Sequence, residues 1–245
     1  MSSIKKNVEE FNSNVVENKG YLYTTNAPLS SILSNKRISD AIIDLIPENI
    51  KTIVDVGCGD GTYTIDIATR KPNAKVSGFD PAKEAIVLAK KQNPQLFFYE
   101  GNILDNTTLK TDKYDIAIIR GVLHHLSDPE LAIKNSGLFA DKIIIVEPNG
   151  NNPILKIIEK TSSYHLKHEE QSFSSNTLIN WCANNNFEVK QLDYIGFVPF
   201  FFPTLLTKII YFFQPFLEKI YFIKKFFGAQ IIIYAEKKTI SQEKK

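Results

Sequence analysis

The sequence has few cysteines, little excess charge of either sign and no apolar run at its amino terminus. Its two cysteines, Cys58 and Cys182, lie far apart, and we expect reduced thiols in a cytoplasmic protein rather than a disulfide. The 29 Lys and Arg against 27 Asp and Glu argue against a nucleic-acid partner. The polar amino-terminal residues predict no secretory signal peptide.

The hydrophobic content, 43% of 245 residues, is enough for a full core and excludes a disordered chain or a disulfide miniprotein. Short apolar runs alternate with helical patterns such as residues 82–91, which predicts parallel strands joined by right-handed crossovers. The expected strands are 51–56, 75–79, 96–99, 114–119, 142–146, 187–194 and 229–236. We therefore predict an α/β fold with a doubly wound, seven-stranded and mostly parallel sheet.

This domain should cover residues 34–245, preceded by a polar arm or lid over residues 1–33. Residues 197–228 are dense in Phe, Tyr, Ile and Leu and should form a helical insertion between the last two strands. A first helix is expected from Ile38 to Ile46, where apolar residues recur at helical spacing.

A glycine loop follows the first expected strand, with glycines at Gly57, Gly59 and Gly61. Glycines there let the backbone pass close under a ligand. A dinucleotide-binding loop needs GxGxxG, whereas the third glycine here comes one residue early. Asp55 and Asp60 in and beside the loop would repel a phosphate, so a cationic or zwitterionic ligand is favoured.

The Asp55 to Gly61 segment resembles the Asp-x-Gly-x-Gly-x-Gly motif of the class I S-adenosylmethionine-dependent methyltransferases. The resemblance covers residues 34–149 and implies a seven-stranded sheet whose last strand is antiparallel. It also implies S-adenosylmethionine as the cofactor, bound by Asp55, the three glycines and Cys58. A tight turn that needs glycine for packing alone is the alternative.

Two further segments fit this resemblance. Asp80 ends the second expected strand, where a carboxylate can accept hydrogen bonds from both ribose hydroxyls, and Pro81 would contact the adenine. Asn102 stands where the family bonds the adenine amine, with Ile103 giving its backbone and an apolar face. The alternatives are a helix cap at Asp80 and a simple turn at Asn102.

The chemistry is expected after the fourth strand, where ligands bind in such sheets. His124 and His125 resemble the LHHxxD segment of small-molecule methyltransferases related to quinone biosynthesis, in some of which a histidine works with an acid ending the fifth strand. The matching acid is Glu147, so we predict a base and its orienting partner. Arg120 and Gly121 should touch the cofactor through their backbone. Alternatively, the histidines pack and cap the next helix.

Two more regions are candidates for substrate contacts. Tyr21 and Tyr23 form the aromatic tip of the arm, and His165, His168 and Glu169 belong to a segment that extends from the fifth strand over the crevice. The spacing of the histidines and glutamates is not HExxH, so no metal site is predicted. A solvated polar helix is the other interpretation.

The insertion is too interrupted by prolines and charges to span a bilayer, and Pro215 should divide it into two helices. Its aromatics, with Lys219, Lys224 and Lys225, suit an interfacial helix at the inner face of the membrane or the wall of a lipid-binding cleft. A packed cap or the face of a homodimer is the alternative.

The sequence thus predicts a cytoplasmic enzyme that transfers a methyl group from S-adenosylmethionine to an oxygen or carbon of a small or lipid-like acceptor. A catalytically silent partner subunit with the same fold is the second hypothesis. A nicotinamide-dependent oxidoreductase is third, because of the glycine spacing.

Overall fold

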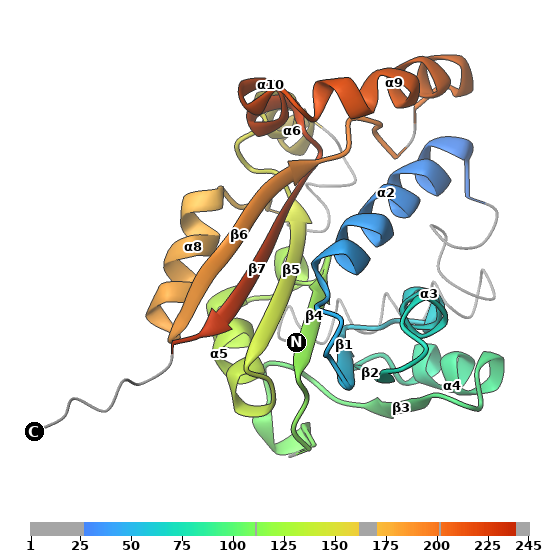
Figure 1. The fold of residues 1–245 in the computed structure, drawn as a ribbon, viewed down its shortest axis with the longest axis vertical. Helices are drawn as coiled ribbons and strands as arrows, with labels where there is room; N and C mark the ends of the chain where they lie inside the picture. The colour runs from blue at the N-terminus through green and yellow to red at the C-terminus, as the bar shows by residue number, and fades with distance from the viewer. Residues whose placement is uncertain (1–26, 111, 162–170, 201, 239–245) are drawn as a thin grey trace, which may run out of the picture.

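The computed structural model describes residues 27–110, 112–161, 171–200 and 202–238. Seven strands form one sheet in the order β3-β2-β1-β4-β5-β7-β6 (Figure 1). The strands are β1 (Thr52–Val56), β2 (Lys75–Asp80), β3 (Phe97–Glu100), β4 (Ile116–Arg120), β5 (Lys142–Pro148), β6 (Phe187–Ile195) and β7 (Gln230–Lys237). Strands β1 to β5 pair in parallel, and β7 is antiparallel to both β5 and β6. The predicted fold class is confirmed.

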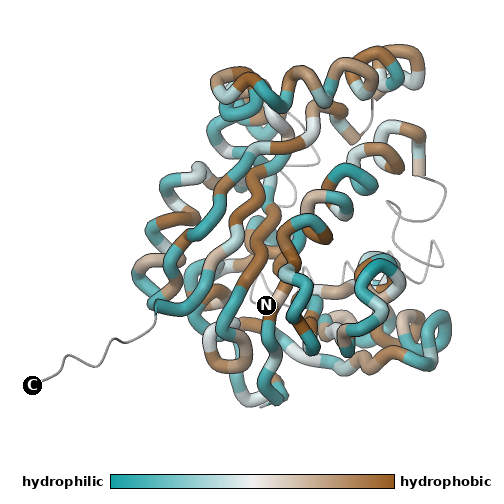
Figure 2. Tube along the Cα trace, viewed as in Figure 1, coloured by the Kyte–Doolittle hydropathy of each residue, from teal (hydrophilic) through white to brown (hydrophobic). Residues whose placement is uncertain are grey.

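The helices are α2 (Leu29–Leu45), α3 (Thr62–Arg70), α4 (Lys83–Gln92), α5 (Pro129–Phe139), α6 (Pro153–Thr161), α8 (Ser175–Asn184), α9 (Thr204–Leu217) and α10 (Tyr221–Phe227), with 3₁₀ turns η1 (Asn106–Thr108) and η2 (Leu123–His125). Both faces of the sheet are covered, which is why its central strands are continuous apolar runs (Figure 2). Ile144 of β5 packs in a core with Ile42 of α2, while its neighbour Ile145 packs in a second core with Ile133 of α5.

Helix α2 begins at Leu29, so the residues before 34 that the sequence assigned to the arm include its first turn. Three serines there hold α2 against the start of the insertion. The Oγ atoms of Ser30 and Ser31 donate to the carbonyl of Phe200 over 2.6 and 2.8 Å, and Ser34 donates to that of Val198 over 2.7 Å. The amino-terminal part of α2 is therefore fixed by side-chain hydrogen bonds to residues far away in the sequence.

The insertion leaves the sheet where β6 ends and returns where β7 begins. Ile195 pairs with Gln230, and the amide of Ala229 donates to the carbonyl of Gly196 over 2.7 Å. The predicted division at Pro215 is wrong, because α9 continues through this proline to Leu217. A proline removes only its own N–H donor from the helix, and beyond it the amide of Glu218 still donates to the carbonyl of Gln214 over 2.9 Å.

The break between the two helices falls instead at Ile220, whose backbone is extended. Helices α9 and α10 lie beyond the tips of β5 and β6 (Figure 1). Within the described ranges, no helix is both long and apolar enough to cross a bilayer.

Candidate cofactor and active site

The glycine loop follows β1 and lies against β2, because the amides of Gly57 and Cys58 both donate to the carbonyl of Phe79, over 2.9 and 3.0 Å. Gly57 and Gly61 have φ angles of 69° and 80°. A Cβ at Gly57 would lie 2.6 Å from Val122, and one at Gly61 would lie 2.9 Å from the ring of Phe98. Packing and backbone conformation therefore suffice to explain these two glycines, whatever the loop binds.

Asp80 joins the glycine loop to the start of α4. Its Oδ2 accepts from the amide of Gly59 over 2.9 Å and its Oδ1 from that of Ala82 over 2.8 Å. Burial raises the pKa of Asp80 to about 6. An ionised carboxylate has about four acceptor positions, so capacity remains for ribose hydroxyls. The residue thus holds the turn before α4, whose N-cap is Ala82, rather than forming the predicted cap, and it also fits the predicted ribose contact.

Asp55 and Cys58 have their side chains engaged inside the protein. Oδ2 of Asp55 accepts from the hydroxyl of Thr64 in α3 over 2.6 Å, and burial raises the pKa of this carboxyl to about 6. The thiol of Cys58 packs beside Phe98, and burial raises its pKa. Neither side chain is therefore free to bond a ligand directly. A ligand could contact the backbone at these two positions and would experience the negative charge of Asp55.

The adenine side is formed by the turn after β3. Oδ1 of Asn102 accepts from the amide of Leu104 over 3.0 Å, as the turn alternative requires. The carbonyl of Ile103 accepts from Nδ2 of Asn135 over 2.7 Å, and the Ile103 side chain is buried. Pro81 is partly exposed at the end of β2. These predicted residues lie on the turns that follow adjacent strands β2 and β3.

His124 and Glu147 are brought together as the sequence predicted. Nδ1 of His124 lies 2.7 Å from Oε2 of Glu147, a fully buried carboxylate at the end of β5. Oε1 of Glu147 also accepts from the amides of Val122 and Leu123, over 2.9 and 2.7 Å. The carboxylate holds the η2 turn as well as the imidazole. With Nδ1–H donated to Glu147, the basic nitrogen of a neutral His124 is Nε2.

His125 lies beside His124 in η2, with 3.9 Å between their ring centroids. The two histidines are neighbours in the same turn, but the 2.7 Å contact with Glu147 is made by the ring of His124. The geometry therefore distinguishes two residues that the sequence treated alike.

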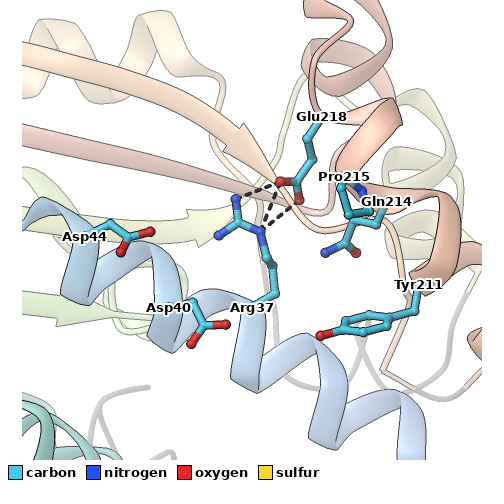
Figure 3. A pocket seen from close by; sticks show the side chains of 7 residues that line it. All are labelled: Arg37, Asp40, Asp44, Tyr211, Gln214, Pro215 and Glu218. Carbon is cyan, nitrogen blue, oxygen red and sulfur yellow. Dashed lines mark hydrogen bonds and ion pairs between the residues drawn. The ribbon is translucent and has the colours of Figure 1, made fainter.

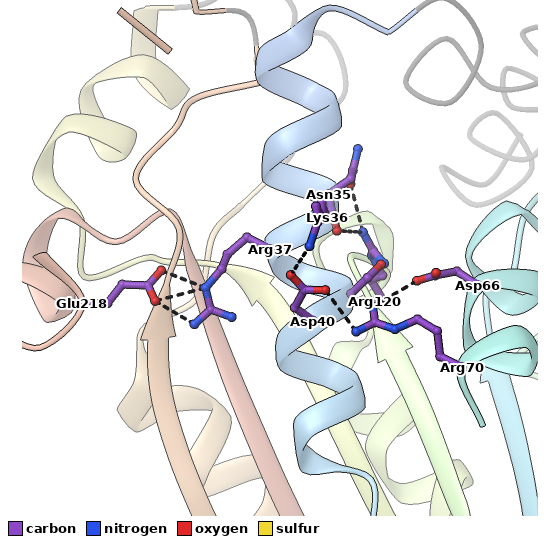
Figure 4. Close-up of polar contacts among 9 residues, drawn as sticks. Asn35, Lys36, Arg37, Asp40, Asp66, Arg70, Arg120 and Glu218 are labelled. Carbon is purple, nitrogen blue, oxygen red and sulfur yellow. Dashed lines mark hydrogen bonds and ion pairs between the residues drawn. The ribbon is translucent and has the colours of Figure 1, made fainter. Parts of the chain in front are cut away.

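Arg120 makes side-chain contacts that the sequence did not predict (Figure 4). Its guanidinium donates to Oγ of Ser39 over 2.9 Å and to Oδ1 of Asn35 over 3.0 Å, and lies 3.6 Å from the ring centroid of Tyr63. No carboxylate of the described chain forms an ion pair with it. The spacing of Asn35 and Ser39 on α2, one helical turn apart, could have indicated a second polar contact surface.

A cavity of about 620 Å³ opens between α2 and α3, beside these contacts. It is lined by Ala27, Ile32, Asn35, Lys36, Ser39, Asp40, Thr62, Tyr63, Asp66 and Arg70. Its charged residues are paired with one another, since Asp40 binds both Lys36 and Arg70, over 2.7 and 3.0 Å. Among the described residues, Arg120 is a cation of this region that forms no ion pair.

The predicted substrate residues Tyr21, Tyr23, His165, His168 and Glu169 lie outside the described residues. Their roles stay predictions. In the part of the chain that is described, no group of three or more His, Cys, Asp or Glu side chains could hold a metal ion.

The sheet order and the glycine loop define a class I methyltransferase fold. The sequence matches the family described as methyltransferase domain over residues 48–195, and the chain belongs to this family. The match confirms the predicted family and, with it, S-adenosylmethionine as the cofactor.

Individual relatives are distant. The chain is 26% identical over 136 residues to a release factor glutamine methyltransferase of Aliivibrio fischeri, spanning 54% of this chain and 48% of that enzyme. It is 25% identical over 174 residues to a ubiquinone biosynthesis O-methyltransferase of Glaesserella parasuis, spanning 61% and 70%. Magnesium protoporphyrin IX methyltransferase from Synechocystis, solved with bound SAH, superposes with a TM-score of 0.62 at 15% identity, covering 87% and 89%. The last similarity concerns the fold alone.

Proposed function

We propose that this protein transfers a methyl group from S-adenosylmethionine to an acceptor, small or lipid-like, that loses a proton from oxygen or carbon. The observation that carries the proposal is the 2.7 Å contact between His124 and the buried Glu147, at the same sheet edge as the glycine loop. Similarity to a ubiquinone biosynthesis O-methyltransferase supports an acceptor of this kind. When bound, the cofactor supplies an electrophilic methyl group on a sulfonium.

Two polar side chains hold the cofactor in this proposal. Asp80 accepts hydrogen bonds from the ribose hydroxyls with the lone pairs that Gly59 and Ala82 leave available. Arg120 binds the carboxylate of the methionine part, because a guanidinium with no ionic partner among the described residues suits such an anion. Pro81 and Ile103 contact the adenine, and Gly121, whose backbone is left-handed, contributes its backbone at the end of β4.

His124 acts as the general base through Nε2. Glu147 fixes the ring and stabilises the imidazolium that forms when the acceptor proton arrives. In the low-dielectric interior this carboxylate lowers the free energy of the charged imidazole more than an exposed one would. Its bonds to two further amides keep it in place during the reaction.

Two variants separate the base from the cofactor site. His124→Ala should lower turnover by about 10² to 10⁴ and leave the affinity for S-adenosylhomocysteine unchanged. Arg120→Met should weaken that affinity by about 10- to 100-fold, the usual scale for a charge-assisted hydrogen bond. Single-turnover methylation of the acceptor and titration calorimetry supply the two readouts. Full turnover in His124→Ala would show that positioning alone carries the reaction.

A further inference from the structure

The outer face of α9 and α10 is apolar, the reverse of an ordinary helix on a soluble protein. The buried residues of α9 are the polar Thr207 and Gln214. Ten large apolar residues of the two helices are 41 to 77% exposed: Leu205, Leu206, Ile209, Phe212, Phe213, Phe216, Tyr221, Phe222, Phe226 and Phe227. We call these ten the insertion surface. Contiguous apolar patches of this kind mark interaction sites.

The two buried polar side chains of α9 form hydrogen bonds that fix the orientation of the helix. Oε1 of Gln214 accepts from the amide of Phe197 over 3.1 Å, and the hydroxyl of Thr207 donates to the carbonyl of Phe202 over 3.2 Å. Turning the helix to bury its apolar side would leave these polar groups without their partners. The exposed apolar face is therefore a property of the native packing.

The charged side chains on the outer face of the insertion are all positive. The sole acidic residue between residues 196 and 228 is Glu218, which is turned inward (Figure 3). Arg37 of α2 donates to both its carboxylate oxygens, over 2.7 to 3.0 Å, and the amide of Gly196 donates to it over 2.9 Å. This pair leaves no acid of the insertion at the outer face.

The lysines of the insertion differ in their contacts, and one of them does not have the predicted role. Lys224 pairs with Asp193 of β6 and is not available to headgroups, contrary to the sequence-based expectation. Lys208 and Lys219 are exposed, and Lys225 lies 5.5 to 5.8 Å from the ring centroids of Tyr221 and Phe226. None of these three forms an ion pair within the described chain.

We propose that the insertion surface docks on an anionic lipid bilayer. Aromatic and aliphatic side chains would enter the headgroup region while Lys208, Lys219 and Lys225 meet anionic headgroups. Helix α9 has 14 residues, about 21 Å of helix, which is too short to span a hydrocarbon core of about 30 Å. The helices therefore lie in the interface.

The sheet register gives this docking a consequence for the acceptor. The insertion starts at the Ile195–Gln230 pair, and Gln230 also pairs with Pro148 at the end of β5, one residue beyond Glu147. The bilayer would thus face the sheet edge that carries the His124–Glu147 pair. The further conclusion that the acceptor is drawn from the bilayer rests on the proposed methyl transfer, whereas the docking does not.

A second copy of the chain is a poorer occupant of the same face. A two-fold interface brings two copies of the same surface together, so both sides would carry the three lysines and neither would offer an acid of the insertion. An anionic bilayer offers the opposite charge over the whole face. Charge complementarity therefore selects the bilayer.

The test is flotation of the purified full-length protein with vesicles of phosphatidylcholine alone or with about 30% phosphatidylglycerol. We expect binding to the anionic vesicles at low salt, weakened at high salt. Replacing Lys208, Lys219 and Lys225 with Glu should lower the partition coefficient by at least about 100-fold. The control replaces Lys75, Lys90 and Lys91, exposed lysines of β2 and α4, with Glu and should bind like the wild type.

A second variant tests the apolar contribution without threatening the fold. Phe212→Ser with Phe222→Ser changes side chains that are 77% and 73% exposed, so it should reduce flotation and leave the melting temperature unchanged. Wild-type protein that does not float with anionic vesicles, or a lysine variant that floats as well as the control, would overturn the proposal. So would a dimer in analytical ultracentrifugation that this phenylalanine variant dissociates. Affinity for S-adenosylhomocysteine, measured on the same samples, reports separately on the proposed function.

Discussion

Single residues at the crevice combine structural and functional tasks. Asp80 holds the turn before α4 and the amide of Gly59, and Glu147 holds the η2 turn as well as His124. Both are buried carboxylates whose cost of burial is offset by N–H donors. Replacing either residue therefore changes local structure together with chemistry, and tests that change protonation rather than identity are the cleaner ones.

The pH dependence of Asp80 gives such a test. Its pKa, raised by burial to about 6, means that the ionised form is disfavoured in the fold. Without cofactor, the stability contributed by this group is lost as pH rises through 6, so the melting temperature should increase as pH falls from 7 to 5. The proposed ribose contact needs the carboxylate, so affinity for S-adenosylhomocysteine should fall about tenfold between pH 7 and pH 5.

Asp55, with a pKa also raised to about 6, adds to the same trend in stability. The acids with lowered pKa values, Asp40, Asp115 and Glu159, stay ionised over this window and do not mask it. The control is Asp80→Asn, in which the part of the affinity change that comes from Asp80 should disappear. Calorimetry at both pH values would contradict the account if the variant kept the full wild-type slope.

At the scale of elements, α2 is the connection between the cofactor crevice and the insertion. Its residues reach Arg120 on one side through Asn35 and Ser39, and Glu218 on the other through Arg37 (Figure 4). A cavity of about 350 Å³ beside the latter contact is lined by Arg37, Asp40, Asp44, Tyr211, Gln214, Pro215 and Glu218. The Arg37–Glu218 pair therefore connects α2 to the insertion at the side of a cavity, not within a close-packed core.

Arg37→Ala should therefore destabilise the protein by about 2 kcal/mol in urea unfolding, because the largely buried carboxylate of Glu218 loses its bidentate partner. The matched control on the same helix is Lys36→Ala. Its pair with Asp40 is largely exposed, so the change should stay within about 0.5 kcal/mol. Equal effects of the two changes would mean that the Arg37–Glu218 pair does not hold the insertion.

The elements themselves were largely predictable from the sequence. All seven strands lie within two residues of the expected bounds, since short apolar runs separated by helical patterns leave few alternatives. The glycine loop, Asp80 and the His124–Glu147 pair were found because each stands at a strand end in a fixed order. The prediction at Pro215 failed because a proline does not always end a helix, and α9 continues through it to Leu217. The contacts of Arg120 and Arg37 could not be predicted, because both depend on how α2 crosses the sheet.

At the scale of the whole molecule, one edge of the sheet gathers the cofactor loop, the proposed base and the insertion. Parallel strands β1, β4 and β5 end there, and the antiparallel β7 starts there. The fold would thus place the proposed lipid-facing surface next to the proposed methyl-transfer site without a separate domain. The arrangement depends on the crevice binding S-adenosylmethionine rather than a dinucleotide.

Titration calorimetry of the wild-type protein with S-adenosylhomocysteine and, separately, with NAD tests this point most directly. The account predicts saturable 1:1 binding of S-adenosylhomocysteine and no binding of NAD, because the glycine spacing and the charges of Asp55 and Asp60 disfavour a pyrophosphate. Saturable binding of NAD with no response to S-adenosylhomocysteine would contradict it.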